Sequence, residues 1–458
     1  KDPCSSRLKV GTPTYRYSYL LLTVHSVGAE SRKAIARARD FDVAVYGATG
    51  FTGRLVSRYL VRRAGAYARI ALAGRSVERL ERLRSQIASE LPLDNQPSVV
   101  LADAADDDSL RALASRSRAV VSVVGPYARL GTPLVQACVA CGAHYVDING
   151  ETPWVRGVID DLHGAAMSAG VRIVPNCGYS VLSDLGVLFT VRAVRRAFGT
   201  PARAVSSLVH FNGRLSGGTL ATGIALDRLP ASVQVERRDP FLLGGAPSGG
   251  PRPEDADPAA ARYEAALGAW SAPFWMASIS TRVVRRSFGL LRETALDEPY
   301  AVDFAYREAA LARDEGVARN LATPMAPPEQ RQRLIDRGRL PGPGEGPSAE
   351  ARASSWFRSY FLGESTDGRR LLTSISGGDP GYEETSKIVG EAALLLALEH
   401  DALPASGACG GVLTPAVALG GALLDRLDGC GLRFAVRGTD LADDLPRMVA
   451  DDFVRPIA

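Results

Sequence analysis

The sequence predicts an α/β fold, a doubly wound Rossmann domain with an inserted second α+β domain. Between Phe41 and about Cys177, short β-branched runs alternate with longer helical runs, a pattern typical of a parallel sheet covered by helices on both faces. After Tyr179 the alternation stops, and glycine- and proline-rich breaks separate the remaining runs. We therefore expect a dinucleotide-binding domain followed by a mixed domain.

The first domain is expected to consist of strands joined by right-handed helical crossovers. The expected strands are residues 41–46, 68–73, 98–103, 119–124, 144–148 and 171–175. The expected helices between them are residues 51–63, 76–90, 107–116, 132–142 and 153–170.

The rest of the chain shows weaker patterns. Residues 206–215 are expected to form an isolated strand, whereas residues 241–261 and 338–351 lack periodicity and are expected to be exposed loops. The helical run 381–400 is expected to pack back on the first domain, with a late strand at 431–437. The predicted organisation is an N-terminal extension at 1–40, a Rossmann domain at 41–178, an α+β substrate domain at 179–379, and C-terminal helices and a strand at 380–458 that pack on the Rossmann domain.

Composition excludes several classes of protein. The chain has 458 residues, of which 46% are hydrophobic and 23% charged, values typical of a soluble globular enzyme. Its net charge is only +4, and it has no basic run with interleaved aromatic residues, so we expect no nucleic-acid partner. The six cysteines are too sparse for a disulfide scaffold, and Cys138 and Cys141 lack a second pair to complete a zinc site. We expect reduced thiols, an intracellular compartment and no metal.

Two segments raise the question of targeting or membrane contact. Residues 1–40 hold many serines, scattered arginines and few acids, which is typical of an organelle transit peptide; the alternative is a cloning or gene-model fragment. Residues 402–424 carry no charge, but Thr414 and Pro415 resemble an N-cap and the first position of a helix. We expect a buried helix here, with a shallow membrane or lipid-surface contact as the alternative.

Three glycines follow the first strand in FDVAVYGATGFTGRLV. The first allows a tight turn, the second a close approach of the backbone to a pyrophosphate, and the third close packing of the helix on the sheet. The helix that begins near Phe51 directs its free N–H groups and its positive dipole end toward that phosphate. The alternative is a plain tight turn that binds nothing. The predicted cofactor-binding residues of this turn are Gly47, Thr49, Gly50, Phe51, Thr52 and Gly53.

The end of the second strand indicates which nucleotide binds. An NAD-binding domain is expected to carry an acidic residue here for the ribose 2′-hydroxyl, but this chain has Arg75 instead. A guanidinium can bind a 2′-phosphate through two N–H donors, so we expect NADP rather than NAD; the alternative is a solvated surface charge. Asp103 is placed to reach the adenine edge, while Asp106 or Asp107 fits better as a helix cap. After the fourth strand, a small wall is expected beside the nicotinamide, made by Val124, Gly125 and Pro126.

Several ordered motifs support a family resemblance. GATGFTG, AGR, VVGPYARLGTPLVQACVACGAHYVDINGE, GVRIVPNCGY followed by SDLG, GDPGYEET and GGVLTPAVALG together resemble the saccharopine dehydrogenase-like oxidoreductases, which include the mycobacterial trans-acting enoyl reductases. The resemblance covers about residues 41–437, with a poorly matching middle. The ordered set of motifs is more specific than the glycine turn alone.

The resemblance implies an NAD(P)-dependent oxidoreductase connected with lipid or glycolipid metabolism and a lipid-linked substrate. It also implies a lipid droplet, a mitochondrion or a membrane as the location, with peripheral contact, and leaves a homodimer open. Two functions from different classes remain: an NADPH-dependent, enoyl-reductase-like enzyme, or a non-catalytic NADP(H)-binding redox sensor or lipid-droplet component. Saccharopine dehydrogenase itself is a further alternative, which would need several basic groups for a tricarboxylate.

One departure from the family pattern bears on activity. The family usually continues its CGF with DSIPSDLG, whereas this chain has CGYSVLSDLG, so Ser180 stands where an aspartate is expected. If that aspartate positions substrate or a proton, this chain is altered. If it only caps the following helix, Ser180 is expected to cap it equally well.

Reduction by a nicotinamide needs a proton source near the ring. Tyr127 is the first candidate as donor or oxyanion stabiliser, and the alternative is that it only packs. Tyr179 is a further candidate. Asp147 and Glu151 are expected to bind substrate or to begin the next helix, while His144 lies at the wrong end of its strand. The sequence has no Tyr-x-x-x-Lys pair, no G-x-S-x-G elbow and no HExxH site, so short-chain dehydrogenase and hydrolase mechanisms are not expected.

Overall fold

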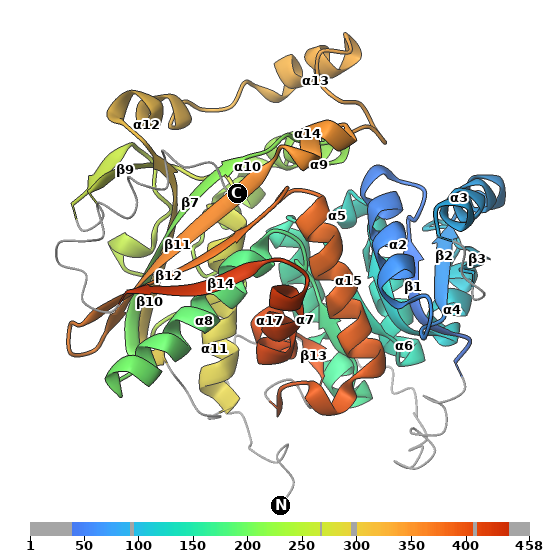
Figure 1. The fold of residues 1–458 in the computed structure, drawn as a ribbon, viewed down its shortest axis with the longest axis horizontal. Coiled ribbons are helices and arrows are strands. Elements are labelled where there is room, and N and C mark those ends of the chain that lie inside the picture. The colour runs from blue at the N-terminus through green and yellow to red at the C-terminus, as the bar shows by residue number, and fades with distance from the viewer. Residues whose placement is uncertain (1–38, 92–95, 266–267, 295–299, 406–409, 439–458) are drawn as a thin grey trace, which may run out of the picture.

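The chain folds around two seven-stranded sheets with helices between them (Figure 1). This computed structural model describes residues 39–91, 96–265, 268–294, 300–405 and 410–438. The expected extension at 1–40 lies outside the described residues, apart from its last two.

The first sheet is parallel throughout and has the strand order of a doubly wound dinucleotide fold, extended by one short strand. From one edge to the other it contains β13 (Gly411–Val412), β6 (Arg172–Val174), β5 (His144–Asp147), β4 (Ser117–Ser122), β1 (Phe41–Tyr46), β2 (Ile70–Gly74) and β3 (Ser98–Leu101). All six residues of β1 are buried, because its side chains alternate between two hydrophobic cores.

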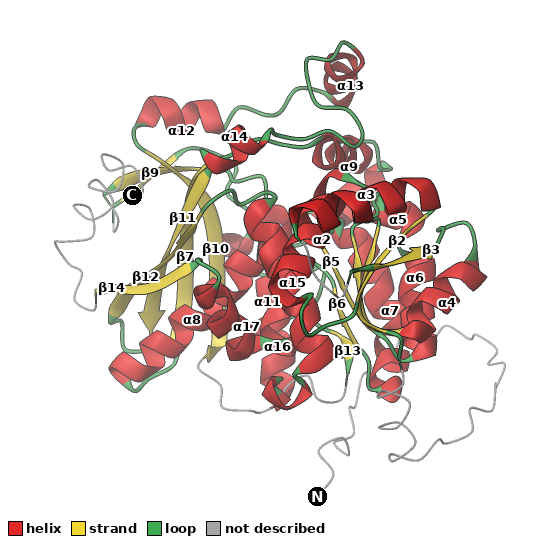
Figure 2. Cartoon of the chain, turned by 45° about the vertical axis from the view of Figure 1, so that its right-hand side comes forward, coloured by secondary structure: helices red, strands yellow, loops and turns green. Residues whose placement is uncertain are grey.

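Each core is closed by a layer of helices. One face is covered by α2 (Phe51–Ala64), α3 (Val77–Glu90) and α15 (Glu383–Leu398), the other by α4 (Asp107–Arg116), α6 (Thr132–Cys141) and α7 (Thr152–Ala169). Figure 2 shows these layers on the two sides of the sheet. The predicted doubly wound fold is therefore confirmed, and the predicted helix 381–400 does return to the first sheet.

The second sheet is mixed, with one parallel pair, β7 and β10, among antiparallel neighbours. In spatial order it contains β14 (Arg433–Gly438), β12 (Arg370–Gly377), β11 (Trp356–Ser365), β7 (Ala202–Asn212), β10 (Tyr300–Ala312), β9 (Ala269–Ala272) and β8 (Arg262–Glu264). Two sequence expectations are wrong here. The strand at 206–215 is not isolated but lies between β11 and β10, and the late strand joins this sheet rather than the Rossmann domain.

Two long helices lie between the sheets, α8 (Ser180–Phe198) and α11 (Ala277–Thr294). Every residue of α8 from Ser180 to Leu188 is buried, because one side faces the second sheet and the other faces the C-terminal helices. The remaining helices are α5 (Tyr127–Leu130), α9 (Gly217–Asp227), α10 (Ala231–Arg237), α12 (Glu315–Leu321), α13 (Pro328–Asp336), α14 (Ala349–Ala353), α16 (Pro415–Ala418) and α17 (Gly420–Gly429), with 3-10 turns at Pro253–Asp255 and His400–Ala402.

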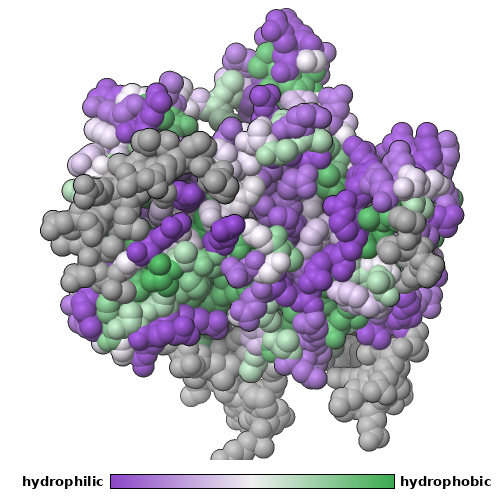
Figure 3. Space-filling view, viewed as in Figure 1, coloured by the Kyte–Doolittle hydropathy of each residue, from purple (hydrophilic) through white to green (hydrophobic). Residues whose placement is uncertain are grey.

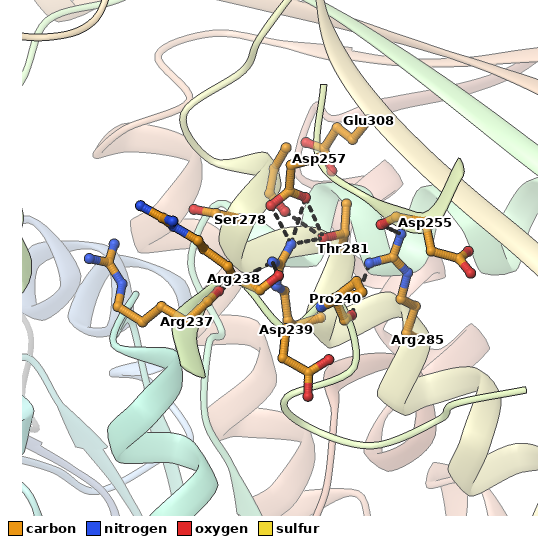
Figure 4. A network of polar contacts seen from close by, with 12 residues as sticks. Arg237, Arg238, Asp239, Pro240, Asp255, Asp257, Ser278, Thr281, Arg285 and Glu308 are labelled. Atoms are coloured by element: carbon orange, nitrogen blue, oxygen red, sulfur yellow. Dashed lines mark hydrogen bonds and ion pairs between the residues drawn. The ribbon is translucent and has the colours of Figure 1, made fainter. Parts of the chain in front are cut away.

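The segment 241–261 is not simply an exposed loop, as its composition had suggested. Leu242 and Leu243 are buried, and buried arginines of α11 hold the backbone around them (Figure 4). Arg285 donates to the Pro240 and Asp255 carbonyl oxygens at 2.9 and 2.8 Å, and Arg286 donates to Leu243 O at 2.8 Å. Long-range hydrogen bonds of this kind have no periodic sequence signal.

The uncharged segment 402–424 contains two short helices, α16 and α17, in its described part. Thr414 occupies the N-cap position of α16 but makes no side-chain cap. Among the described residues, no helix has the length and apolar character needed to cross a membrane. On the face shown in Figure 3, polar residues surround a region below and left of the centre where apolar residues gather.

Candidate cofactor and active site

The glycine turn after β1 is crowded in a way that only glycines permit. Gly47 has a φ of +89°, and a Cβ atom there would lie 2.5 Å from Val124 Cγ2. Gly50 is the N-cap residue of α2, and its N–H donates to Gly47 O at 3.0 Å. A Cβ atom on Gly53 would lie 2.1 Å from Gly47 O. The third glycine therefore lets the first turn of α2 sit against the phosphate turn itself.

This geometry fits a dinucleotide. The first N–H groups of a helix have no partner within the helix, and the positive end of its dipole lies there. The bare backbone at Gly47 and Gly50 leaves no side chain between those groups and a pyrophosphate. When bound, NADP would lie along the carboxyl edge of the sheet, with its pyrophosphate on this turn.

Two arginines that the glycine pattern does not predict lie beside the turn. Arg54 Nη1 donates to Thr49 O at 2.9 Å, and burial lowers the pKa of Arg54. The Arg352 guanidinium lies 5.7 Å from the centre of the Phe51 ring, which also meets Tyr382 edge-on at 5.1 Å. The first residue of α2 is thus in contact with segments that lie between strands of the second sheet, since Arg352 comes between β10 and β11 and Tyr382 between β12 and β14. Thr52 is partly exposed in the first turn of the same helix.

The residues predicted to hold the adenosine half lie at the ends of neighbouring strands. Arg75 directly follows β2 and is exposed. The pKa of Tyr46, at the end of β1, is raised to about 12, chiefly by burial and also by the charge of Asp103, while the charge of Arg75 acts to lower it. Both charged groups therefore act at the same edge. Asp103 Oδ1 accepts from Ala105 N–H at 3.0 Å, and Asp106 caps α4, as predicted.

The loop after β4 approaches the glycine turn, as the contact of Val124 with Gly47 shows. Val124 and Pro126 are half-buried, and Gly125 between them is exposed. Of the three residues that the sequence assigns to the wall beside the nicotinamide, Val124 is thus the one that borders the glycine turn.

Tyr127 is committed to structural contacts. Its hydroxyl donates to Ser122 O at 3.0 Å, its ring lies 5.4 Å from the Trp154 ring, and burial raises its pKa well above the usual 10. Glu151 accepts from the N–H groups of Tyr127 and Ala128, both at 2.8 Å. This arrangement favours a packing role for Tyr127 over a role as proton donor. The hydrogen bonds of Glu151 connect the loop after β4 with the loop after β5.

Asp147 holds the next pair of loops together. It is fully buried and accepts from Tyr145 Oη at 2.9 Å, from Asn149 N–H at 3.0 Å and from Asn176 N–H at 2.9 Å. Burial raises its pKa to about 6. His144, at the opposite end of β5, accepts from Arg172 N–H at 3.1 Å, and burial lowers its pKa to about 3. Both side chains are therefore engaged in hydrogen bonds within the protein.

Ser180 does not cap α8, so the capping expectation is wrong. The N-cap position belongs to Tyr179, and no side chain caps the helix. Backbone turns do this instead, since Val181 N–H donates to Gly178 O at 3.1 Å and Leu182 N–H to Tyr179 O at 2.9 Å. Ser180 is the first helical residue, and its hydroxyl accepts from Ser280 Oγ at 3.5 Å.

The SDLG and LTPA motifs meet at a buried carboxylate. Asp184 Oδ2 accepts from Ala416 N–H at 2.7 Å and thereby caps α16, while Oδ1 accepts from Ser287 Oγ at 2.5 Å. Burial raises the pKa of Asp184 to about 7. Asp379 of the GDPGYEET motif similarly accepts from the N–H groups of Tyr382 and Glu383 at 3.0 and 3.1 Å. Each of these acids therefore fixes the start of a helix.

No group of three or more histidine, cysteine, aspartate or glutamate side chains within the described ranges could hold a metal ion.

Comparison with known proteins gives consistent matches. A family model of the saccharopine dehydrogenase NADP-binding domain matches residues 43–174. A Mycobacterium tuberculosis protein provisionally named a trans-acting enoyl reductase is 39% identical over 417 residues, covering 87% of this chain and 97% of its own. The trans-acting enoyl reductase of Mycobacterium ulcerans is 35% identical over 430 residues, covering 86% and 97%. Among solved structures, apo saccharopine dehydrogenase from Saccharomyces cerevisiae covers 86% of this chain and 99% of its own at 13% identity, with a TM-score of 0.47.

Proposed function

The chain belongs to the saccharopine dehydrogenase-like family that includes the trans-acting enoyl reductases, and it is an NAD(P)-dependent oxidoreductase with NADP as cofactor; from this premise we propose that it reduces a carbon–carbon double bond in a lipid-linked enoyl substrate. The observation that carries the proposal is the joint position of the glycine turn and Arg75 at one edge of the sheet, with second-domain segments in contact with Phe51.

When bound there, NADPH supplies a hydride to the substrate. The chain's own residues would hold the pyrophosphate at the start of α2 and a 2′-phosphate at Arg75. The buried network of Glu151, Asp147 and Asn149 keeps the β4, β5 and β6 loops in one arrangement beside the expected nicotinamide position. Because these loops are cross-linked before substrate arrives, they form a rigid wall against which an apolar substrate can be oriented.

Turnover tests the proposal directly. Purified full-length chain is mixed with NADPH and a panel of enoyl thioesters of different chain length, together with a total lipid extract, and NADPH consumption is followed by absorbance. We expect consumption with at least one enoyl substrate and formation of the saturated product by mass spectrometry. The matched control is Gly53→Ala, which places a Cβ atom 2.1 Å from Gly47 O and should abolish both binding and turnover.

The second candidate is a non-catalytic NADP(H)-binding protein. One observation favours it, the structural commitment of Tyr127, Asp147 and Glu151, which leaves no free acid on the β4 and β5 loops described above. Tight NADPH binding with no turnover across the panel would support this candidate and contradict the reductase.

A further inference from the structure

A polar cluster interrupts the apolar packing between α8 and the second sheet. At its centre is Glu308 of β10, whose side chain is fully buried. Its Oε1 accepts from Ser183 Oγ at 3.2 Å and its Oε2 from Tyr306 Oη at 2.9 Å. Within the described part of the chain, no arginine, lysine or histidine forms an ion pair with it. A buried carboxylate without an ion-pair partner is costly to ionise, so burial favours the protonated form of Glu308.

The hydroxyl of Tyr179 lies beside this cluster. It is buried and makes no hydrogen bond of ordinary geometry, although Ser359 is close enough to lower its pKa while Glu308 raises it. The ring is only half-buried, and it meets the Phe274 ring at 5.7 Å, which in turn meets Phe211 at 5.8 Å. The Tyr179 ring thus packs edge-on against Phe274, and its buried hydroxyl is near enough to Glu308 for that charge to raise its pKa.

The position of Tyr179 connects the cluster with the cofactor edge. It follows β6 by five residues and precedes α8, so it lies where the carboxyl end of the Rossmann sheet passes into the second domain. The other acids considered for this edge are committed to backbone N–H groups or, for Tyr127, to a carbonyl oxygen. Of the two tyrosines that the sequence offers as proton donors, Tyr179 is therefore the one whose hydroxyl has no hydrogen-bond acceptor among the described residues.

We propose that Tyr179 donates the proton in the reduction of the enoyl substrate and that Glu308 is the acid that restores it. This inference rests on the proposed reductase function and names its proton source. The hydride adds to the β-carbon, the π electrons move to the thioester as an enolate, and the α-carbon takes the proton from the Tyr179 O–H bond. The resulting phenolate takes the proton of the Glu308 carboxyl, which is restored from solvent after product leaves.

The charged and titratable neighbours of Glu308 are few. Tyr306 lies on the same strand, Ser183 and Tyr179 come from the α8 side, and Asp257 comes from the segment that α11 holds (Figure 4). The charge of Asp257 favours the protonated form of Glu308, and burial raises the pKa of Glu308 to about 7. Asp257 is itself paired with Arg282 and partly exposed, so it is the group of this set closest to solvent.

The test compares Tyr179→Phe and Glu308→Gln with wild type and with Asp184→Asn. Asp184 is the matched control, because it is an equally buried acid outside the cluster. We expect Tyr179→Phe to lower kcat by about 10²- to 10⁴-fold with an unchanged NADPH dissociation constant. We expect the wild-type kcat to fall as pH rises through about 7, and Glu308→Gln to be slow and to lose that dependence. Asp184→Asn should retain it.

A second readout does not require turnover. Infrared difference spectra recorded across the pH range should show protonated carboxyl absorption at pH 6, from which Glu308→Gln removes one component and Asp184→Asn, whose own carboxyl is also protonated there, removes a different one. An ionised Glu308 at pH 6, or a Tyr179→Phe enzyme with wild-type kcat, would overturn the proton assignment alone. A wild-type protein that turns over no enoyl substrate would overturn the reductase proposal and the donor role with it.

Discussion

At the scale of single residues, the cofactor turn depends on the absence of side chains. A Cβ atom added at Gly53 would lie 2.1 Å from Gly47 O, so the helix and the turn could not both keep their positions. The neighbouring Val124 limits Gly47 in the same way from the β4 loop. A side chain added at Gly47 or Gly53 would therefore affect stability and cofactor binding together, since the same backbone serves both.

We therefore expect Gly53→Ala to lower the free energy of unfolding by about 1–3 kcal/mol, the usual cost of overpacking a well-packed site. NADPH binding should fall below detection. Gly157→Ala in α7 is the control, because a Cβ atom there meets nothing within 4 Å; it should be neutral or stabilise by about 0.4–1 kcal/mol. Denaturant titration and NADPH fluorescence measure both variants. Equal behaviour of the two would contradict the close contact at Gly53.

At the scale of elements, carboxylates connect pieces that lie far apart in the sequence. Glu151 joins the start of α5 to the β5–α7 loop, and Asp184 joins α8 to α16. Each accepts backbone N–H groups that would otherwise be left without partners at a buried loop or helix end. The motifs that carry the family resemblance are therefore largely a framework of helix caps and loop ties around the cofactor edge.

Glu151→Gln tests this framework. The amide keeps the size of the side chain but turns an N–H₂ group toward one of the two backbone donors, so one buried donor loses its acceptor. We expect a loss of about 1–3 kcal/mol of stability and weaker NADPH binding. Glu78→Gln, at an exposed position on α3, should stay within about 0.5 kcal/mol of wild type. If both glutamine variants matched wild type in chemical denaturation, the tie between the loops would carry no stability.

The elements differ in how far the sequence predicts them. Local patterns predict six strands of the first sheet, because these are apolar runs that, apart from the edge strand β3, are largely buried on both faces, and the turn chemistry follows them directly. The two-residue strand β13 has no such pattern and is not predicted from the sequence. The second sheet could not be ordered from the sequence, because β7, β10 and β11 pair across long separations and carry polar residues such as Glu308 on an inner face. The same difference applies to the candidate site. The glycine turn could be predicted from the local sequence, whereas the partners of Tyr127 and the buried acid of β10 depend on segments that are distant in the sequence.

At the scale of the whole molecule, buried acids make stability depend on pH. Burial raises the pKa of Asp184 and of Glu308 to about 7 and that of Asp147 to about 6. In the unfolded chain these groups titrate near about 4. Between those values the folded protein binds more protons than the unfolded chain, so this contribution to stability is full at low pH and is lost as pH rises to about 7. His144, with its lowered pKa, acts in the opposite direction below about pH 6.5.

The acid contribution can be isolated by comparison with the double variant Asp184→Asn, Glu308→Gln. Wild type should lose unfolding free energy relative to the double variant as pH rises from 5 to about 7.5, and the difference between the two should stay constant above that pH. Urea titrations at several pH values measure it, and the histidine contribution cancels because both proteins carry it. A difference that does not change with pH would mean that these acids are ionised in the folded protein.

The account as a whole rests on NADPH lying on the glycine turn with its 2′-phosphate at Arg75. The most direct measurement is the pair of dissociation constants for NADPH and NADH, obtained by fluorescence titration of wild type and of Arg75→Ala, with Arg82→Ala on the exposed side of α3 as the control. We predict that wild type and the control bind NADPH more tightly than NADH, and that Arg75→Ala loses most of this difference while its NADH affinity is retained. Equal affinities of wild type for the two nucleotides, or a preference that survives in Arg75→Ala, would contradict the account.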